Sequence, residues 1–440
     1  MFEFGFYEKE ITPPLGCPIP GYFNLRRGSD VLDRLYARAA VVREDGNTVA
    51  LISIDACTVE KAVVDAIKSR VEEYTGIAAS NILVGYTHTH TGMPRSDYAG
   101  GDEVATKSSE GFHTVVTKLI ADCAILAYQR LQKATPVFGK GEVSGISFCR
   151  DYFMKNGTPQ TNPTRTSPQI EGPVADTDNE LPVLFVKDEN DKPLGAILGF
   201  ACHPDCVSGD KYSGDYISEL SIQLKKTYGD DFVSVYLLGA CGDINHFDVS
   251  RESDPSDHYR KMGRKLAGEA QKIVAFAEPL KESGVKASFE TITIPRVHIS
   301  DEKIAQAQHY IDTVTEMKGV KLAADGTDPE QYNLAMSKRL MNFLNTTPES
   351  FEVPVQVIQI GEFTLYAFPS EVFCHFGKLV KQGDGTGCCM VSTLCNDSFA
   401  YVPTRDMFYD TIYESRPGSN QLDKEAGYIM AEKLVSMKKQ

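Results

Sequence analysis

The sequence predicts an α/β fold, in which a mostly parallel or mixed β-sheet is flanked by helices. Short apolar runs that end in polar residues alternate with segments of helical periodicity, as strands and helices alternate in α/β proteins. An expected strand at 48–54, a helix at 59–74 and a strand from Ile82 form a β-α-β unit, for which parallel pairing is the rule. The 440 residues, 42% of them hydrophobic, can bury a large core, and this length allows about two or three domains without requiring them.

Further elements follow in order along the chain. Helices are expected from apolar spacing at 113–131, 215–227, 264–277, 301–317, 329–343 and up to about 437, and strands at 194–201, 232–238, 285–297 and 353–368, the last as a hairpin about Gly361 and Glu362. Polar, turn-rich stretches at 97–111 and 148–173 are expected to be loops. The two largely polar helices between about 300 and 345 resemble an insertion without a core of its own.

Composition excludes several classes of partner. The formal charge of −15 and the pI of about 5.1 argue against nucleic acid and anionic membranes, because both need a basic surface. We find no apolar stretch near the roughly 18 residues of a membrane span, and no signal peptide. Eleven scattered cysteines, an odd number, predict reduced thiols in the cytoplasm. Cys202 and Cys206 flank His203 without a second cysteine pair, so we expect buried thiols rather than a cysteine-based metal site. The oligomeric state stays open.

A His-x-His pair follows the strand that begins at Ile82. In Tyr-Thr-His-Thr-His-Thr-Gly, residues 86–92, extended backbone would send the rings of His88 and His90 to the same face, since side chains alternate along a strand. Such a pair is suited to binding one metal ion or one substrate. The alternative is a hydrogen-bonded histidine pair that caps a loop.

Two later strands also end in polar residues. His203 follows the strand at 194–201, and Asp243 and Asn245 follow the strand at 232–238. If the strands are parallel, these residues and His88 meet at one edge of the sheet, together with Asp55. Two histidines and a carboxylate make a zinc site with an open position. Glu371, at the expected start of a helix, is one acid among many.

Several segments together resemble the catalytic domain of the neutral/alkaline ceramidases, zinc amidases that cleave the N-acyl bond of ceramide. The segments are Thr-His-Thr-His-Thr-Gly-Met at 87–93, Cys-Arg-Asp at 149–151, His-Pro-Asp at 203–205, Pro-Ser-Glu-Val-Phe at 369–373, Tyr-Val-Pro-Thr at 401–404 and Tyr-Glu-Ser at 413–415. Their order is that of the family, and the spacing of Tyr401 and Tyr413 is kept. The resemblance covers nearly the whole chain and implies a single catalytic domain over 1–440.

The resemblance implies roles for individual residues. It implies a Zn²⁺ ion bound by His88, His203, Glu371 and Tyr401. It further implies that His90 hydrogen-bonds substrate or transfers protons, that Tyr413 polarises the scissile carbonyl, and that Arg150 lines the pocket. Packing is the alternative for each tyrosine and for Arg150.

One departure concerns the substrate. The family serine of Gly-Asp-Val-Ser-Pro-Asn is Asn245 here, and an amide cannot accept an acyl group, although it can hydrogen-bond a substrate or an oxyanion. The family's C-terminal immunoglobulin-like domain and secretion signal are not found in this sequence. Asp243 and Asp215 are candidates to orient a ligating histidine, or equally to cap loops.

The expected function is therefore a zinc-dependent hydrolase that cleaves an N-acyl amide bond of a small-molecule or lipid-like substrate other than ceramide, with metal-activated water. The alternatives are a zinc esterase or a hydrolase of small or sugar-linked amides on the same scaffold, and a non-catalytic metal-containing binding protein.

Overall fold

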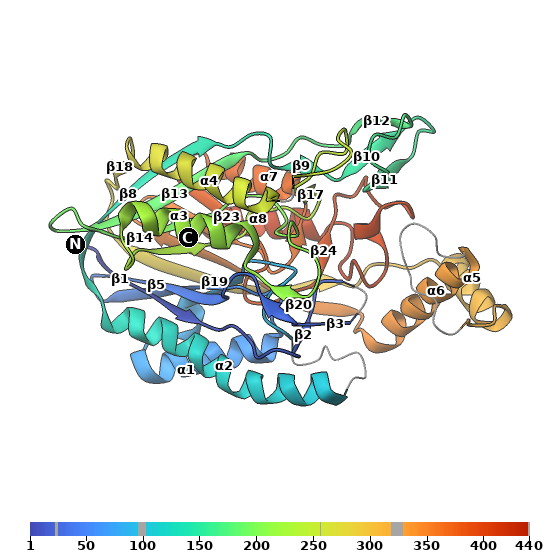
Figure 1. Cartoon of the computed structure of the whole chain (residues 1–440), viewed down its shortest axis with the longest axis horizontal. Coiled ribbons are helices and arrows are strands. Elements are labelled where there is room, and N and C mark those ends of the chain that lie inside the picture. The colour runs from blue at the N-terminus through green and yellow to red at the C-terminus, as the bar shows by residue number, and fades with distance from the viewer. Residues whose placement is uncertain (23–24, 96–102, 256, 318–328, 439–440) are drawn as a thin grey trace.

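The computed structural model describes residues 1–22, 25–95, 103–255, 257–317 and 329–438, and Figure 1 shows its strands between layers of helices. The helices are α1 (Lys61–Thr75), α2 (Glu103–Gln129), α3 (Asp215–Tyr228), α4 (His258–Val274), α5 (Asp301–Thr313), α6 (Pro329–Thr346), α7 (Cys374–Asp384) and α8 (Ala426–Lys438), with 3₁₀ turns at Ala79–Asn81 and Tyr413–Ser415. The strands of the larger sheets are β1 (Glu3–Glu10), β5 (Tyr36–Glu44), β6 (Asn47–Ile54), β7 (Ile82–Tyr86), β8 (Gln132–Glu142), β13 (Glu180–Asp188), β14 (Pro193–Leu198), β16 (Val233–Tyr236), β18 (Glu278–Pro279), β19 (Val285–Pro295), β20 (Ser350–Ile360), β21 (Phe363–Ala367) and β23 (Cys389–Ser392). The remaining short strands are β2 (Pro18–Ile19), β3 (Arg26–Arg27), β4 (Asp30–Val31), β9 (Phe148–Cys149), β10 (Asp151–Met154), β11 (Pro159–Thr161), β12 (Ile170–Pro173), β15 (Lys211–Tyr212), β17 (Ile244–Asn245), β22 (Glu371–Val372) and β24 (Tyr401–Val402).

The main sheet is mixed. Within the described residues its order is β16-β14-β13-β8-β1-β5-β6-β7, with β18 beside β8. The pairs β6/β7 and β14/β16 are parallel, and the other neighbouring pairs are antiparallel. The parallel pairing expected across α1 is therefore confirmed, and of the two expected sheet types the structure has the mixed one.

The main sheet folds back on itself between β1 and β8. These strands share only the pairs Glu3 with Lys133 and Phe4 with Gln132, so the two halves of the sheet can turn to face each other. In consequence β16 packs on β5 and β6, and the Ser53 hydroxyl donates a hydrogen bond to the carbonyl of Tyr236. The ends of β7 and β14 come close because the two halves of the main sheet stack on each other. The two strands are therefore not neighbours at one edge of a parallel sheet, as the sequence suggested.

One part of the core lies between the sheets, and another lies between the main sheet and the helices that cover its outer faces. Apolar side chains of both halves of the main sheet and of the β19-β20-β21-β23 sheet share one cluster, which includes Phe4, Leu184 and Leu365. On the outside, α2 packs on β1 and β5, and α4 packs on β8 and β13. The helices α7 and α8 pack on the β19-β20-β21-β23 sheet. Figure 1 shows α1 and α2 along the lower side and the α5–α6 pair projecting at the right-hand end. This pair encloses a small apolar cluster with Phe408.

The structure corrects several local expectations. Residues 97–102 of the expected loop lie outside the described residues, but from Glu103 the chain is already helical in α2, ten residues before the expected start at 113. The turn-rich segment 148–173 contains a small sheet of β10, β11 and β12. Within α2, Lys107–Gln129 is long and apolar enough to cross a membrane by length and composition, contrary to the expectation of no such stretch. Its buried residues, among them Ile120 and Ala124, belong to the protein core.

Candidate active site

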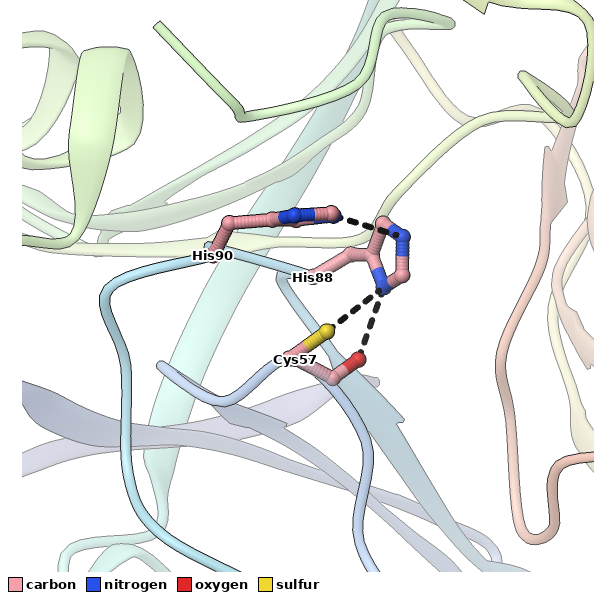
Figure 2. Close-up of side chains that lie close together, drawn as sticks. All are labelled: Cys57, His88 and His90. Carbon is pink, nitrogen blue, oxygen red and sulfur yellow. Dashed lines mark hydrogen bonds between the residues drawn. The ribbon is translucent and has the colours of Figure 1, made fainter. Parts of the chain in front are cut away.

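His88 stands in a turn directly after β7, and its backbone is not extended as the sequence suggested. Its φ is +66°, a left-handed conformation that is uncommon outside glycine. The loop after β6 holds it there, because His88 N–H donates to the carbonyl of Ala56 at 2.8 Å and Nδ1 lies 2.8 Å from the carbonyl of Cys57. The rings of His88 and His90 meet edge-on, with centroids 4.9 Å apart, as Figure 2 shows for the cluster with Cys57.

His203 is oriented by the same kind of contact. It follows β14, and its Nδ1 lies 2.8 Å from the carbonyl of Cys241 and 2.9 Å from that of Ile244. Carbonyl oxygens only accept, so Nδ1 carries the proton in the neutral rings of both His88 and His203. Their Nε2 atoms then present lone pairs to the interior.

Glu371 and Tyr401 come from two short strands that pair side by side. Glu371 was expected to open a helix, but it lies in β22, and α7 begins three residues later. In the parallel pairing of β22 with β24, Glu371 is the register partner of Tyr401. Both side chains therefore reach the same place. Glu371 Oε2 lies 3.1 Å from His88 Nε2 and 3.3 Å from His203 Nε2, and Tyr401 OH lies 3.4 Å from His203 Nε2.

The convergence of these four atoms fits a cation. Nε2 of both histidines, a carboxylate oxygen and a phenol oxygen face one another in a buried space, and Glu371 Oε2 has no hydrogen-bond partner among the described residues. Burial lowers the pKa of His203 to about 4, with the positive charge of Arg150 acting in the same direction. For His88, burial opposes the charged form but Glu371 outweighs it and raises the pKa well above its usual range, so a cation that binds here displaces a proton from Nε2. Two imidazoles with a carboxylate are ligands typical of zinc.

His90 lies beside this cluster rather than within it. Its Nε2 is 3.4 Å from Nε2 of His88, and its Nδ1 is 3.6 Å from the carboxylate of Asp205. Asp205 accepts a hydrogen bond from the Tyr22 hydroxyl. Burial, assisted by the neighbouring His88, lowers the pKa of His90 well below its usual range. His90 is therefore neutral near pH 7 and is placed to take up a proton.

Arg150 and Tyr413 line the same space. Burial opposes the charge of Arg150, but its ion pair with Glu414, with Nε 2.5 Å from Oε1, keeps the pKa well above the usual value. Arg150 Nη1 lies 3.5 Å from His203 Nε2, and its guanidinium lies 4.9 Å from the ring centroid of Tyr401. Its Nη2 is buried without a hydrogen-bond partner in the described part of the chain. The ring of Tyr413 packs edge-on to Tyr401, at 5.6 Å between centroids.

Of the remaining predicted residues, Asn245 follows Ile244, whose carbonyl holds His203, and the two aspartates hold loops. Asn245 lies in β17 and donates to the Asn162 side chain at 3.0 Å. Asp243 accepts from the N–H of Cys374, the first residue of α7, and burial raises its pKa to about 6. Asp215 accepts from the backbone of Val207 and Tyr216. The contacts of both aspartates are thus those of the loop-capping alternative, although Asp243 also steadies the segment that follows Glu371.

Sequence reasoning missed three residues that support the site: Cys57, whose carbonyl orients His88, Asp205, which faces His90, and Glu414, which pairs with Arg150. Cys57 and Glu414 act through contacts across long sequence distances, which no local pattern indicates. The only available signal for Asp205 and Glu414 was their place within the quoted segments at 203–205 and 413–415.

Comparison with known proteins agrees with this geometry. Residues 2–245 match a family model described as neutral/alkaline non-lysosomal ceramidase, N-terminal. Neutral ceramidase B of Dictyostelium discoideum is 26% identical over 266 residues, which are 54% of this chain and 35% of that relative. The matched region thus spans about a third of the relative's length.

Two solved structures share the fold. The neutral ceramidase from Pseudomonas aeruginosa superposes with a TM-score of 0.72 at 19% identity, over 99% of this chain and 74% of that one. A ceramidase complexed with C2 superposes with a TM-score of 0.73 at 20% identity and the same coverage. The mixed α/β architecture is therefore that of the neutral ceramidase structures.

Proposed function

Since the chain belongs to the neutral/alkaline non-lysosomal ceramidase family, a family of hydrolases, we propose that it is a zinc-dependent hydrolase that cleaves an N-acyl amide bond with water. The observation that carries this proposal is the convergence of His88 Nε2, His203 Nε2, Glu371 Oε2 and Tyr401 OH. The donor set fits zinc: His88, His203 and Glu371 alone leave a fourth position for water or substrate, and with Tyr401 as a ligand that position would be a fifth.

A zinc ion held by these residues would polarise the scissile carbonyl and lower the pKa of a bound water molecule toward about 7. The chain supplies the proton transfers. His90, neutral and buried, accepts the proton of the attacking water at Nε2 and returns it to the leaving amine. Asp205, on the Nδ1 side of the ring, favours the protonated form that exists between these two steps.

The developing oxyanion is met by donors from three segments. Arg150 remains charged in a buried position, and its unpartnered Nη2 is available for a charge-assisted hydrogen bond. The phenol of Tyr413 and the amide of Asn245 are the other proposed donors, the latter held by Asn162. Preorganised donors of this kind are worth about 10²- to 10³-fold in rate each.

The substrate that we propose is an N-acyl amide other than ceramide, in which the amine is small or sugar-like or the acyl chain is lipid-like. Asn245 cannot accept an acyl group, so water remains the nucleophile. We further propose that the chain acts as one catalytic domain in the cytoplasm, because its sheets share a core and its eleven cysteines are all free thiols in the structure. The charge of −15 argues against nucleic acid as a partner.

The experiment is hydrolysis of a panel of N-acyl amides, ceramide and matched esters, each with and without a chelator. We expect chelator-sensitive cleavage of amides, with ceramide a poor substrate. Metal analysis of His88→Ala and His203→Ala should show loss of the ion, while His375→Ala, an exposed histidine on α7, should retain it. Full occupancy in either site variant would overturn the ligand assignment. Preferential turnover of esters would replace the amidase by an esterase, and a bound ion without any turnover would leave a binding protein.

A further inference from the structure

A second cluster of metal-binding side chains lies outside the proposed catalytic site. Cys206, His246 and His258 each offer one ligand atom, and these atoms all lie within 4.8 Å of one another. They come from three separate segments: the loop after β14, the residue after β17, and the first residue of α4. No residue of this cluster is among the four proposed catalytic ligands.

The hydrogen bonds of the two histidines leave lone pairs for a ligand. His258 Nε2 lies 2.9 Å from the carbonyl of His246, which can only accept, so Nε2 carries the proton and Nδ1 is the basic atom. His246 is 8% exposed, and its Nδ1 is buried with no hydrogen-bond partner in the described part of the chain. The ring centroids of the two histidines are 5.4 Å apart. A buried ring nitrogen without a partner is costly unless something binds it.

The surroundings of the cluster favour a soft cation. The thiol of Cys206 touches the thioether of the buried Met262, with 3.4 Å between the sulfur atoms. One thiolate and two imidazoles suit zinc better than magnesium or calcium, which require oxygen ligands.

We propose that Cys206, His246 and His258 form a second metal site, which takes a zinc ion with a structural role. His203 lies three residues before Cys206, and Asn245 directly precedes His246. The ion would therefore tie the loop that carries a proposed catalytic ligand to the strand that carries a proposed substrate contact, and both to the start of α4. Cys206 would then be a metal ligand rather than one of the buried thiols expected near His203, whereas Cys202 is buried and free.

The test uses the whole chain, stripped with a chelator and titrated with Co²⁺ as a spectroscopic substitute for zinc. We expect two ions per chain and a near-ultraviolet thiolate-to-cobalt charge-transfer band. Cys206→Ser should bind one ion and lose the band. His88→Ala should also bind one ion but keep the band, so this result stays separate from the fate of the catalytic proposal. Cys388→Ser, a partly exposed thiol elsewhere, should match the unmodified chain.

Two further variants keep the proposal falsifiable. Cys57→Ser tests the other thiol near histidines, 3.7 Å from His88 Nδ1, and should keep the band. His258→Gln, at a partly exposed helix start, should fold and weaken uptake of the second ion by about 100-fold or more, since even residues behind a ligand cost roughly 10- to 100-fold. An unmodified chain without the thiolate-to-cobalt band, a band that survives Cys206→Ser, or a band lost in Cys57→Ser would each overturn the proposal. A single ion whose band is lost in Cys206→Ser would support the second site and count against the catalytic one.

Discussion

Backbone carbonyls aim both histidines of the proposed catalytic site. Nδ1 of His88 is fixed by the carbonyl of Cys57, and Nδ1 of His203 by those of Cys241 and Ile244. A carbonyl fixes the tautomer and the ring orientation without depending on the side chain of the residue that supplies it. Substitutions at positions such as Ile244 can therefore leave the aim of the rings intact as long as the backbone keeps its course.

The role of Asn245 can be tested by its truncation. Asn245→Ala should reduce turnover by about 10- to 1000-fold if the amide is an oxyanion donor, because one preorganised hydrogen bond is lost. Metal content should not change, since Asn245 is not a proposed ligand. Steady-state kinetics and elemental analysis on the same preparation measure both quantities.

Asn162→Ala is the matched comparison, because it removes only the side chain that holds Asn245 at 3.0 Å. We expect a smaller loss of rate from it than from Asn245→Ala. Unchanged kinetics in Asn245→Ala would remove this side chain from the mechanism. A covalent acyl-enzyme on any serine, trapped and detected by mass spectrometry, would contradict attack by water.

At the scale of elements, the close crossing of α3 and α4 depends on Gly263. A methyl group there would lie 2.5 Å from the carbonyl oxygen of Tyr216 and 2.6 Å from Cβ of Glu219. Gly263→Ala should therefore lower the free energy of unfolding by about 1–3 kcal/mol. Gly268, on the same helix, has nothing within 4 Å of the added methyl group, and Gly268→Ala should raise it by about 0.5–1 kcal/mol. Urea denaturation of the two variants should move the midpoint in opposite directions, and equal shifts would contradict the crossing.

The contact between Asp384, at the end of α7, and Lys438, at the end of α8, should make the free energy of unfolding depend on pH in the acid range. Burial alone would raise the pKa of Asp384, but its hydrogen bonds, first that from Lys438, lower it to about 2. A carboxyl whose pKa is lower in the folded state stabilises the fold above its unfolded value near 4, and this contribution is lost as the pH falls toward 2. Asp384→Asn should cost about 1–3 kcal/mol at pH 7 and less at pH 3.

Urea midpoints at the two pH values measure this difference. Asp191→Asn, at an exposed turn with a surface ion pair, should cost under about 1 kcal/mol at both. A cost for Asp384→Asn that is as large at pH 3 as at pH 7 would show that the charge of Asp384 does not provide the stability.

Sequence patterns predicted the strands and helices better than the backbone conformation of the site residues that follow them. The strand at 48–54 and the parallel unit across α1 follow from apolar runs, and β6 and β7 occur as expected. The extended conformation expected of His88 is wrong because the turn depends on a hydrogen bond to Ala56, which lies 32 residues earlier. The helix expected at Glu371 begins later because Glu371 forms a strand pair with Tyr401. Tyr401 lies 30 residues farther along the chain, so a local sequence pattern does not indicate this pairing.

At the scale of the whole molecule, the thiols test the proposed reducing compartment. All eleven cysteines are free, nine of them buried, with Cys206 and Cys388 partly exposed. Titration under denaturing, non-reducing conditions with a chelator should therefore find close to all eleven thiols. In the native chain Cys388 should react quickly, and Cys206 should do so only after its proposed zinc ion has been removed. Several protected disulfides would contradict the proposal.

The return of the main sheet on itself could not be predicted from the sequence. The middle strand β8 carries polar residues and glycine, such as Lys140 and Gly141, so its pattern does not stand out as a strand. The apolar run at 181–186 in β13 does indicate a strand, although none was expected there. The bend depends on how few pairs β1 and β8 share, which is a property of three-dimensional register. The resemblance to a family, by contrast, identified the four residues that the structure brings together.

These four residues are spread from position 88 to position 401: His88 and His203 follow β7 and β14, and Glu371 and Tyr401 lie in the paired strands β22 and β24. They meet only when distant parts of the chain have come together. A ribosome synthesises His88 more than 300 residues before Tyr401, so a growing chain does not yet have the complete set of metal ligands. Contacts of such long range also make folding slow. Loading of the proposed catalytic site should therefore be a late event, after synthesis. In Cys206→Ser, which lacks the proposed second site, a pulse of labelled zinc should enter completed molecules but no nascent ones.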